Sequence, residues 1–178
     1  MRQQLIDDFP SKQSYRYDRN VTQMNLSAFM LGQQKYTEAE RVLLDCLADL
    51  ASAPADLKRD VAFRQAVAVA HLNLGFALQF QNKSAEAATE YASGVQVLEK
   101  LVEAFPRSAP IRTMLIDSLI NVSKLCIAQE QYAAAIAPTE RIVQLYAQLA
   151  AEFPEEPHYL ESKQKYQQAL DQLHEAAK

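Results

Sequence analysis

The residues best suited to chemistry in this chain are three histidines and scattered carboxylates, and their spacing does not suit catalysis. His71, His158 and His174 form no metal-binding pair, and no nucleophile or phosphate-binding motif lies near them. General acid–base work needs carboxylates held in a cleft, whereas Glu155 and Glu156 precede a proline in what reads as a solvated helix start. We therefore expect no enzyme activity, no metal site and no cofactor.

The cysteines and the chain start bear on localisation. Cys46 and Cys126 lie in apolar helical surroundings, and two cysteines imply no disulfide framework, so we expect buried thiols in a reducing, cytoplasmic compartment. The opening MRQQLIDDFP carries acidic residues where a signal peptide has its apolar stretch. No uninterrupted apolar run reaches the roughly 18–20 residues that cross a bilayer, so we expect no membrane insertion.

Composition favours a helical globular protein. Apolar residues make up 49% of the 178 residues, and glycine occurs only 3 times. The net charge is −4, with 18 Lys and Arg against 22 Asp and Glu and no basic cluster. Nucleic-acid binding requires such a cluster to displace phosphate counterions, so we expect no nucleic-acid partner.

Recognition chemistry is better represented, because three asparagines recur every 48 residues: Asn25, Asn73 and Asn121. A carboxamide both donates to and accepts from a peptide backbone, so three in register could form a binding ladder. They could equally bond a neighbouring helix within the fold. Both interpretations stay open on the sequence.

Other residues follow the same period of 48, among them Gln33, Gln81, Gln129, Ala39, Ala87 and Ala135. Phe-Pro pairs at Phe9, Phe105 and Phe153 keep the same register, with Leu57-Lys58 in the remaining slot. A fixed period of 20–50 residues is typical of solenoids, in which each unit buries its apolar face by stacking on its neighbours. This predicts one domain over residues 1–178, with repeats at about 11–58, 59–106 and 107–154.

Each repeat contains two segments with apolar residues at helical spacing, separated by a short polar turn. In the second repeat the turn covers residues 81–84, and Ser84 is a candidate N-cap. Pro138 falls inside a predicted helix, where a kink or a missing hydrogen bond is expected. A last amphipathic segment, about 156–177, predicts a capping helix, and residues 1–10 resemble the remnant of a preceding helix.

The residues around each turn resemble the tetratricopeptide repeat (TPR). In the second repeat, LNLGFALQFQNKSAEAATEYASG carries the small residues Gly75, Ala87 and Gly94 and the aromatic Tyr91 at the family's spacing. The family repeat has 34 residues, so this 48-residue unit is a long-helix variant. It is similar to arrays in bacterial multidomain proteins, some of them joined to a Ser/Thr protein kinase domain, although nothing of a kinase is in this chain.

The resemblance implies an all-α fold, a TPR-like α-α superhelix (solenoid) of three helical hairpins plus a C-terminal capping helix. It also implies a concave groove lined by the first helices of the hairpins. The candidate ligand-binding residues are Asn25, Asn73, Asn121, Leu72, Phe76, Phe80, Lys124 and Met24. Phe76 and Phe80 could be a groove anchor or core between repeats, and Lys124, with nearby Arg112, could take a carboxylate or be a solvated charge.

Two functions follow as expectations. The first is a non-catalytic protein–protein interaction scaffold that binds a protein or peptide segment in the groove. The alternative is a structural or self-association segment of a larger multidomain protein, because an array with a missing neighbour exposes an apolar end.

Overall fold

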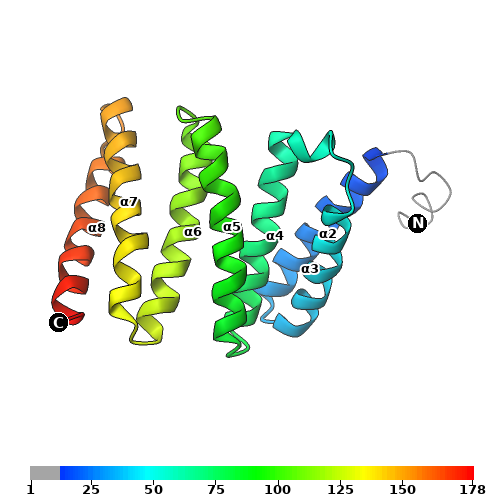
Figure 1. Ribbon diagram of the computed structural model, residues 1–178, viewed down its shortest axis with the longest axis horizontal. Helices are drawn as coiled ribbons and strands as arrows, with labels where there is room; N and C mark the ends of the chain where they lie inside the picture. Colours follow the sequence, from blue (N-terminus) through cyan, green and yellow to red (C-terminus); the bar gives the residue numbers. More distant parts are fainter. Residues whose placement is uncertain (1–12) are drawn as a thin grey trace. The chain divides into compact units, whose positions relative to one another are not determined.

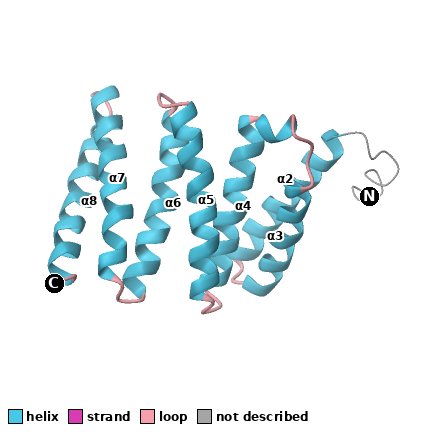
Figure 2. Cartoon of the chain, in the orientation of Figure 1, coloured by secondary structure: helices cyan, strands magenta, loops and turns pink. Residues whose placement is uncertain are grey.

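The computed structural model describes residues 13–178, with side chains from residue 19 onward, and this part of the chain is helical throughout, without strands. The all-α prediction is confirmed, while the predicted remnant at residues 1–10 lies outside the described residues. The elements are α2 (Gln13–Gly32), α3 (Tyr36–Ala51), the 3-10 turn η1 (Leu57–Arg59), α4 (Val61–Gln79), α5 (Ser84–Ala104), α6 (Ala109–Ala128), α7 (Tyr132–Glu152) and α8 (Pro157–Ala176). Short loops join them (Figure 2).

The period of 48 residues recurs in the helix starts. One series of helices begins at Gln13, Val61, Ala109 and Pro157, and the other begins at Tyr36, Ser84 and Tyr132. Helix starts are set by local signals in the chain, so the regular spacing follows from the sequence period.

The turns inside the three helix pairs share one backbone geometry. Gln34, Asn82 and Glu130 have φ values of 59°, 61° and 59°, in the left-handed region. After Asn82, the N–H of Lys83 donates to the carbonyl of Leu78 at 3.0 Å, and the other two turns make the equivalent bond. This is the Schellman arrangement that ends a helix and satisfies its last carbonyls. The Lys83 carbonyl accepts from the N–H of Ala87, so Lys83 precedes the helix and the predicted N-cap Ser84 is instead its first residue.

The left-handed turn positions predict a stabilising substitution. Glu130→Gly should raise the free energy of unfolding by about 0.5–1 kcal/mol, because glycine adopts this conformation without a steric penalty. Asn82→Gly is the matched control and should change it by only a few tenths of a kcal/mol, since asparagine already tolerates the left-handed region. Urea denaturation of both variants measures the difference. An equal gain in both would contradict the steric explanation.

The chain divides into two compact units, with the boundary between Val97 and Leu98. This boundary falls inside α5, which is one continuous helix. The expected single domain over residues 1–178 stays a prediction. In the first unit α3 packs on both α2 and α4 (Figure 1). The start of α5 packs on α4, where the ring of Tyr91 covers Gly75.

In the second unit the helices α6, α7 and α8 pack consecutively, each against the next (Figure 1). The end of α5 joins α7 through an ion pair in which Arg141 donates to Glu99 at 2.9 and 2.8 Å. Pro138 lies inside α7 and has no N–H to donate, yet the helix continues through it to Glu152.

Small residues that repeat in the sequence lie at fully buried positions. Ala39, Ala87 and Ala135 each have an exposed fraction of 0%. Ala87→Leu should therefore lower the free energy of unfolding by about 1–3 kcal/mol, because a packed interface cannot accept three more carbons without strain. Thermal denaturation of the variant measures this. Unchanged stability would mean that the helix register at this position is wrong.

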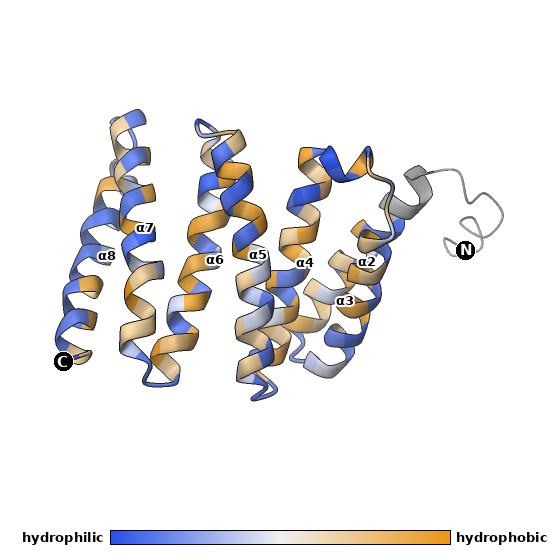
Figure 3. Cartoon of the chain, in the orientation of Figure 1, coloured by the Kyte–Doolittle hydropathy of each residue, from blue (hydrophilic) through white to orange (hydrophobic). Residues whose placement is uncertain are grey.

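Helix α4 is the only described helix that is long and apolar enough to cross a membrane. Its composition has a second explanation, because it packs on α3 and α5 and buries residues on several sides, including Phe63, Ala68, Leu74 and Leu78. The structure therefore gives no clear sign of membrane insertion. By contrast, α8 is largely hydrophilic (Figure 3) and buries only Leu170 and Leu173.

Candidate functional site

Three aromatic rings meet in the first unit, two from the end of α4 and one from the start of α3. Tyr36 stacks on Phe80 with ring centroids 5.0 Å apart and planes 15° apart, and Phe76 lies 4.6 Å from Phe80. Phe80 remains 52% exposed. Phe76 and Phe80 therefore pack against Tyr36 of the preceding helix pair, while Phe80 also remains partly exposed to solvent.

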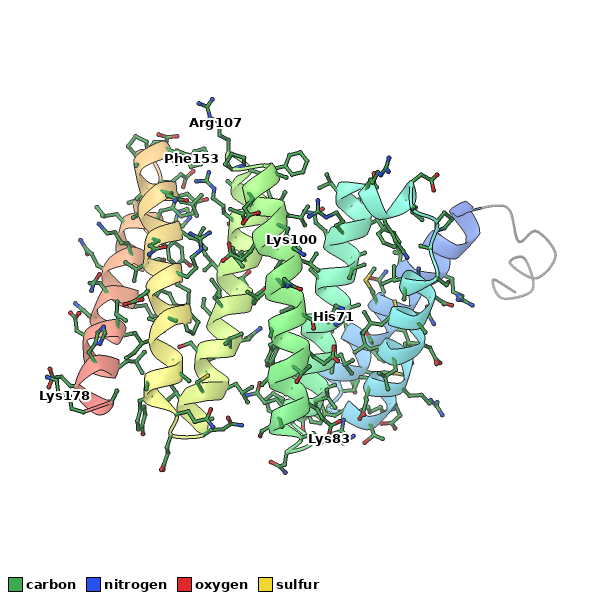
Figure 4. All side chains as sticks on the ribbon, in the orientation of Figure 1. His71, Lys83, Lys100, Arg107, Phe153 and Lys178 are labelled. Atoms are coloured by element: carbon green, nitrogen blue, oxygen red, sulfur yellow. The ribbon has the colours of Figure 1, made fainter. Side chains whose placement is uncertain are left out.

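A polar frame borders this aromatic cluster and ties the α4–α5 turn to α3. Lys83, labelled in Figure 4, donates to both carboxylate oxygens of Glu40 at 2.8 Å. Gln81 also donates to Glu40, at 2.7 Å, and accepts from Thr37 at 3.2 Å. The hydrogen bond from Lys83 lowers the pKa of Glu40 and raises the pKa of Lys83. Such partly exposed pairs add little stability, so the frame mainly orients the turn.

The three repeating asparagines lie on α2, α4 and α6, the first helices of their pairs. Asn25 is exposed, and Asn73 and Asn121 are half-buried. Among the side chains that the structure describes, none of the three amides takes part in a hydrogen bond. Asn25 and Asn73 belong to the first unit and Asn121 to the second.

The two apolar candidates from the first helices, Leu72 and Met24, are less exposed to solvent than Phe80. Leu72 is half-buried and packs against α5, since a Cβ added at Gly94 would lie 2.9 Å from the Leu72 Cγ. Met24 is half-buried on α2. Leu72 therefore contributes to the interface between α4 and α5.

The last candidate, Lys124, borders a pocket of about 400 Å³ in the second unit. The walls come from α6, through Ile120 and Ile127, and from α8, through Tyr166 and Leu173. This volume falls within the range of ligand pockets, and an apolar lining with a few polar groups is their usual character.

The floor of this pocket is polar but internally satisfied. The hydroxyls of Ser123 and Thr139 are 2.9 Å apart, and Thr139 also donates to the carbonyl of Ala135 at 2.8 Å. One wall is fixed by Tyr166, whose ring stacks on Tyr146 of α7 at 5.7 Å and 17°. Burial raises the pKa of both tyrosines, so both hydroxyls stay protonated near neutral pH.

Of the two cations that the sequence analysis placed together, Lys124 lines this pocket and Arg112 does not. Lys124 and Lys165 line it, and its lining includes no Asp or Glu. Arg112, the predicted companion of Lys124, is 0% exposed and donates to both oxygens of Glu152 at 3.0 and 2.5 Å. Arg112 is therefore committed to an ion pair with Glu152, whose own side chain is 42% exposed, and the interpretation in which Arg112 takes a ligand carboxylate is wrong.

The two cysteines and His71 are not part of the pocket lining. Burial raises the pKa of Cys46 to about 11 and also raises that of Cys126, so both thiols are protonated and weakly nucleophilic near neutral pH. His71 lies 2.7 Å from the Glu90 carboxylate, between α4 and α5. Among the described residues no cluster of three or more His, Cys, Asp or Glu gathers as a metal-ligand set.

Sequence reasoning missed most of this pocket, including Tyr132, Thr139, Lys165 and Tyr166. A comparison of the chain with itself at an offset of 96 residues contains a usable signal. Such a shift aligns Phe76 with Gln172 and Phe80 with Ala176. Two large rings are thus replaced by smaller side chains at equivalent positions, which indicates an unfilled space.

In comparisons with protein-family models and with curated proteins, no family model and no curated protein matches this chain.

Proposed function

We propose that this protein is a non-catalytic scaffold that binds a protein or peptide segment. In this proposal the helix pairs form a TPR-like solenoid of three hairpins capped by α8, and the first helices of the pairs present the binding surface. The setting is a cytoplasmic one. Support comes from the period of 48 in the helix starts and from the identical turns at Gln34, Asn82 and Glu130.

The observation that carries the binding role is the pocket beside Lys124. It combines apolar walls, tyrosine rings and two lysines without a neighbouring acid in its lining. The partly exposed Phe80 and the half-buried Asn73, whose amide makes no hydrogen bond to a described residue, add a second surface of similar character in the first unit. Aromatic rings with free polar groups at their edges are typical of protein interaction surfaces.

A capture experiment from source-cell lysate tests this function. Wild type is compared with an Asn73→Ala/Phe80→Ala variant and a Lys124→Ala variant, all first shown to be folded by circular dichroism. Leu44→Ala is the control, because Leu44 is 50% exposed but lies on α3. Proteins retained by wild type and the control, and lost by either test variant, support the scaffold. Retention by all variants contradicts the proposed surfaces.

The alternative, self-association, is favoured by a different surface on α2. Leu26 is 43% exposed and Phe29 is 64% exposed. Their equivalents one period later, Leu74 and Ala77, are 1% and 0% exposed. The exposed face of α2 therefore carries apolar residues at the positions that are buried on α4. A partner that covers this face would remove these residues from water.

Light scattering over a range of protein concentrations tests the alternative. Self-association through this face predicts a mass that rises with concentration in wild type and stays monomeric in Leu26→Glu/Phe29→Glu. Leu44→Glu serves as the matched control, because it adds a charge at another exposed leucine. A monomeric wild type at high concentration excludes this alternative.

A further inference from the structure

The pocket in the second unit has a filled counterpart in the first unit, related by a shift of 96 residues. In the first unit the position is taken by the stacked rings of Tyr36, Phe76 and Phe80. In the second unit Tyr132 stands at the position of Tyr36, but Gln172 and Ala176 replace the two phenylalanines. The pocket therefore corresponds to the volume that aromatic rings occupy in the related site.

The second unit retains the tyrosine on which a ring stacks in the first unit, but it lacks the phenylalanine that stacks there. Tyr36 stacks face to face on Phe80. Tyr132 lines the pocket and, among the side chains that the structure describes, makes no ring contact. Further along the pocket, Leu43 of the first unit is replaced by the smaller Thr139, which adds to the open volume.

The open site has also gained positive charge. Lys124 and Lys165 replace Ala28 and Val69 of the filled site, and they come from different helices, α6 and α8. No acidic side chain lines the pocket, so these two charges are not neutralised within it. Ammonium groups bordering an apolar pocket favour a ligand that has an apolar centre and negative charge around it.

We propose that this pocket receives an aromatic side chain from an acidic segment of a partner protein. The ring stacks on Tyr132 as Phe80 stacks on Tyr36, and acidic residues flanking the ring pair with Lys124 and Lys165. This inference rests on the proposed scaffold function and names the chemistry of the partner.

Synthetic pentapeptides with blocked ends test the proposal without knowledge of the partner. The peptides are Glu-Glu-X-Glu-Glu, with X as Phe or Ala, and Lys-Lys-Phe-Lys-Lys, each titrated into the full chain and followed by NMR of the backbone amides. We expect the acidic Phe peptide to bind at least tenfold more tightly than the other two. The amide signals of Tyr132, Thr139 and Ala176 should shift. Equal affinity for the Phe and Ala peptides, or for the acidic and basic peptides, would overturn the proposal.

Variants locate the binding to this pocket. Gln172→Phe/Ala176→Phe copies the filling of the first unit and should reduce affinity for the acidic Phe peptide at least tenfold. Lys124→Met/Lys165→Met should reduce it similarly, whereas Lys163→Met, on the same helix but outside the pocket lining, should leave it unchanged. Tyr132→Ala provides an independent test if the filled variant does not fold. Undiminished binding by the folded pocket variants overturns the site.

The lysate capture experiment separates this inference from the function on which it rests. Partners lost from Gln172→Phe/Ala176→Phe and retained by Lys163→Met support both. Partners retained equally by the folded filled variant leave the scaffold function standing and contradict the assignment of this pocket.

Discussion

Arg112→Ala should lower the free energy of unfolding by about 3 kcal/mol. The guanidinium is fully buried and makes a two-point contact with Glu152, the last residue of α7. Its removal takes away both the ion pair and the packing of a long side chain inside the second unit. Urea denaturation of the variant measures the loss.

Arg141→Ala is the matched control for this prediction. Arg141 also makes a two-point contact with a glutamate, Glu99, but its own side chain is 30% exposed, whereas that of Arg112 is 1% exposed. The two glutamates are similarly exposed, at 30% for Glu99 and 42% for Glu152. Exposed pairs contribute roughly 0–1 kcal/mol, so the control should lose much less stability. Equal losses in the two variants would show that burial of Arg112 does not matter.

Acidification offers a second readout of the same pair. The hydrogen bond from Arg112 lowers the pKa of Glu152 below its unfolded value. The corresponding stabilisation is present above the unfolded pKa and is lost as pH falls through the lower folded pKa. Below about pH 4.5, wild type should therefore lose stability more steeply than Arg112→Ala, as followed by thermal melts across pH.

Gly75→Val should lower the free energy of unfolding by about 3 kcal/mol. A Cβ at this position would lie 2.7 Å from the Tyr91 ring, which is 0% exposed and anchored by a 2.8 Å hydrogen bond to Gln79. The ring cannot move aside, so the added carbons overpack the interface between α4 and α5. Gly32→Val is the control, because nothing lies within 4 Å of a Cβ there, and it should change stability by at most about 0.5 kcal/mol.

A double-mutant cycle isolates the contact with Tyr91. The equivalent pair in the second unit is Ser123 and Thr139, which share a hydrogen bond. Gly75→Ser/Tyr91→Thr should therefore be at least about 1 kcal/mol more stable than the sum of its single variants implies. Additive losses would show that the glycine and the tyrosine are not coupled.

The sequence contained enough information to predict the helices and the turns inside the helix pairs to within a few residues. Polar residues with a left-handed backbone at Gln34, Asn82 and Glu130 lie within or beside the turns read from the apolar pattern. Helix α8 covers Pro157–Ala176, close to the predicted 156–177. These features depend on neighbours within a few residues along the chain, and the repetition of each signal three times separated it from chance.

The candidate site was only partly predictable. The period placed Lys124 on the first helix of its pair, and Lys124 does line the pocket. It did not indicate that Arg112, also on α6, turns inward to a glutamate 40 residues away. It also left open whether Phe76 and Phe80 pack on another helix, which the contact with Tyr36 settles.

By itself, the sequence determined the all-α class, the period of 48 residues and the places where helices begin and end, because these follow from local propensity and spacing. Only the tertiary structure decided which side chain lies across from which. Gly75 meets a tyrosine while Ser123 meets a threonine, and Gln172 and Ala176 leave space where two rings stand in the first unit. Packing joins residues that are distant along the chain, and whether their volumes fill or leave a space is a property of the pair rather than of either residue.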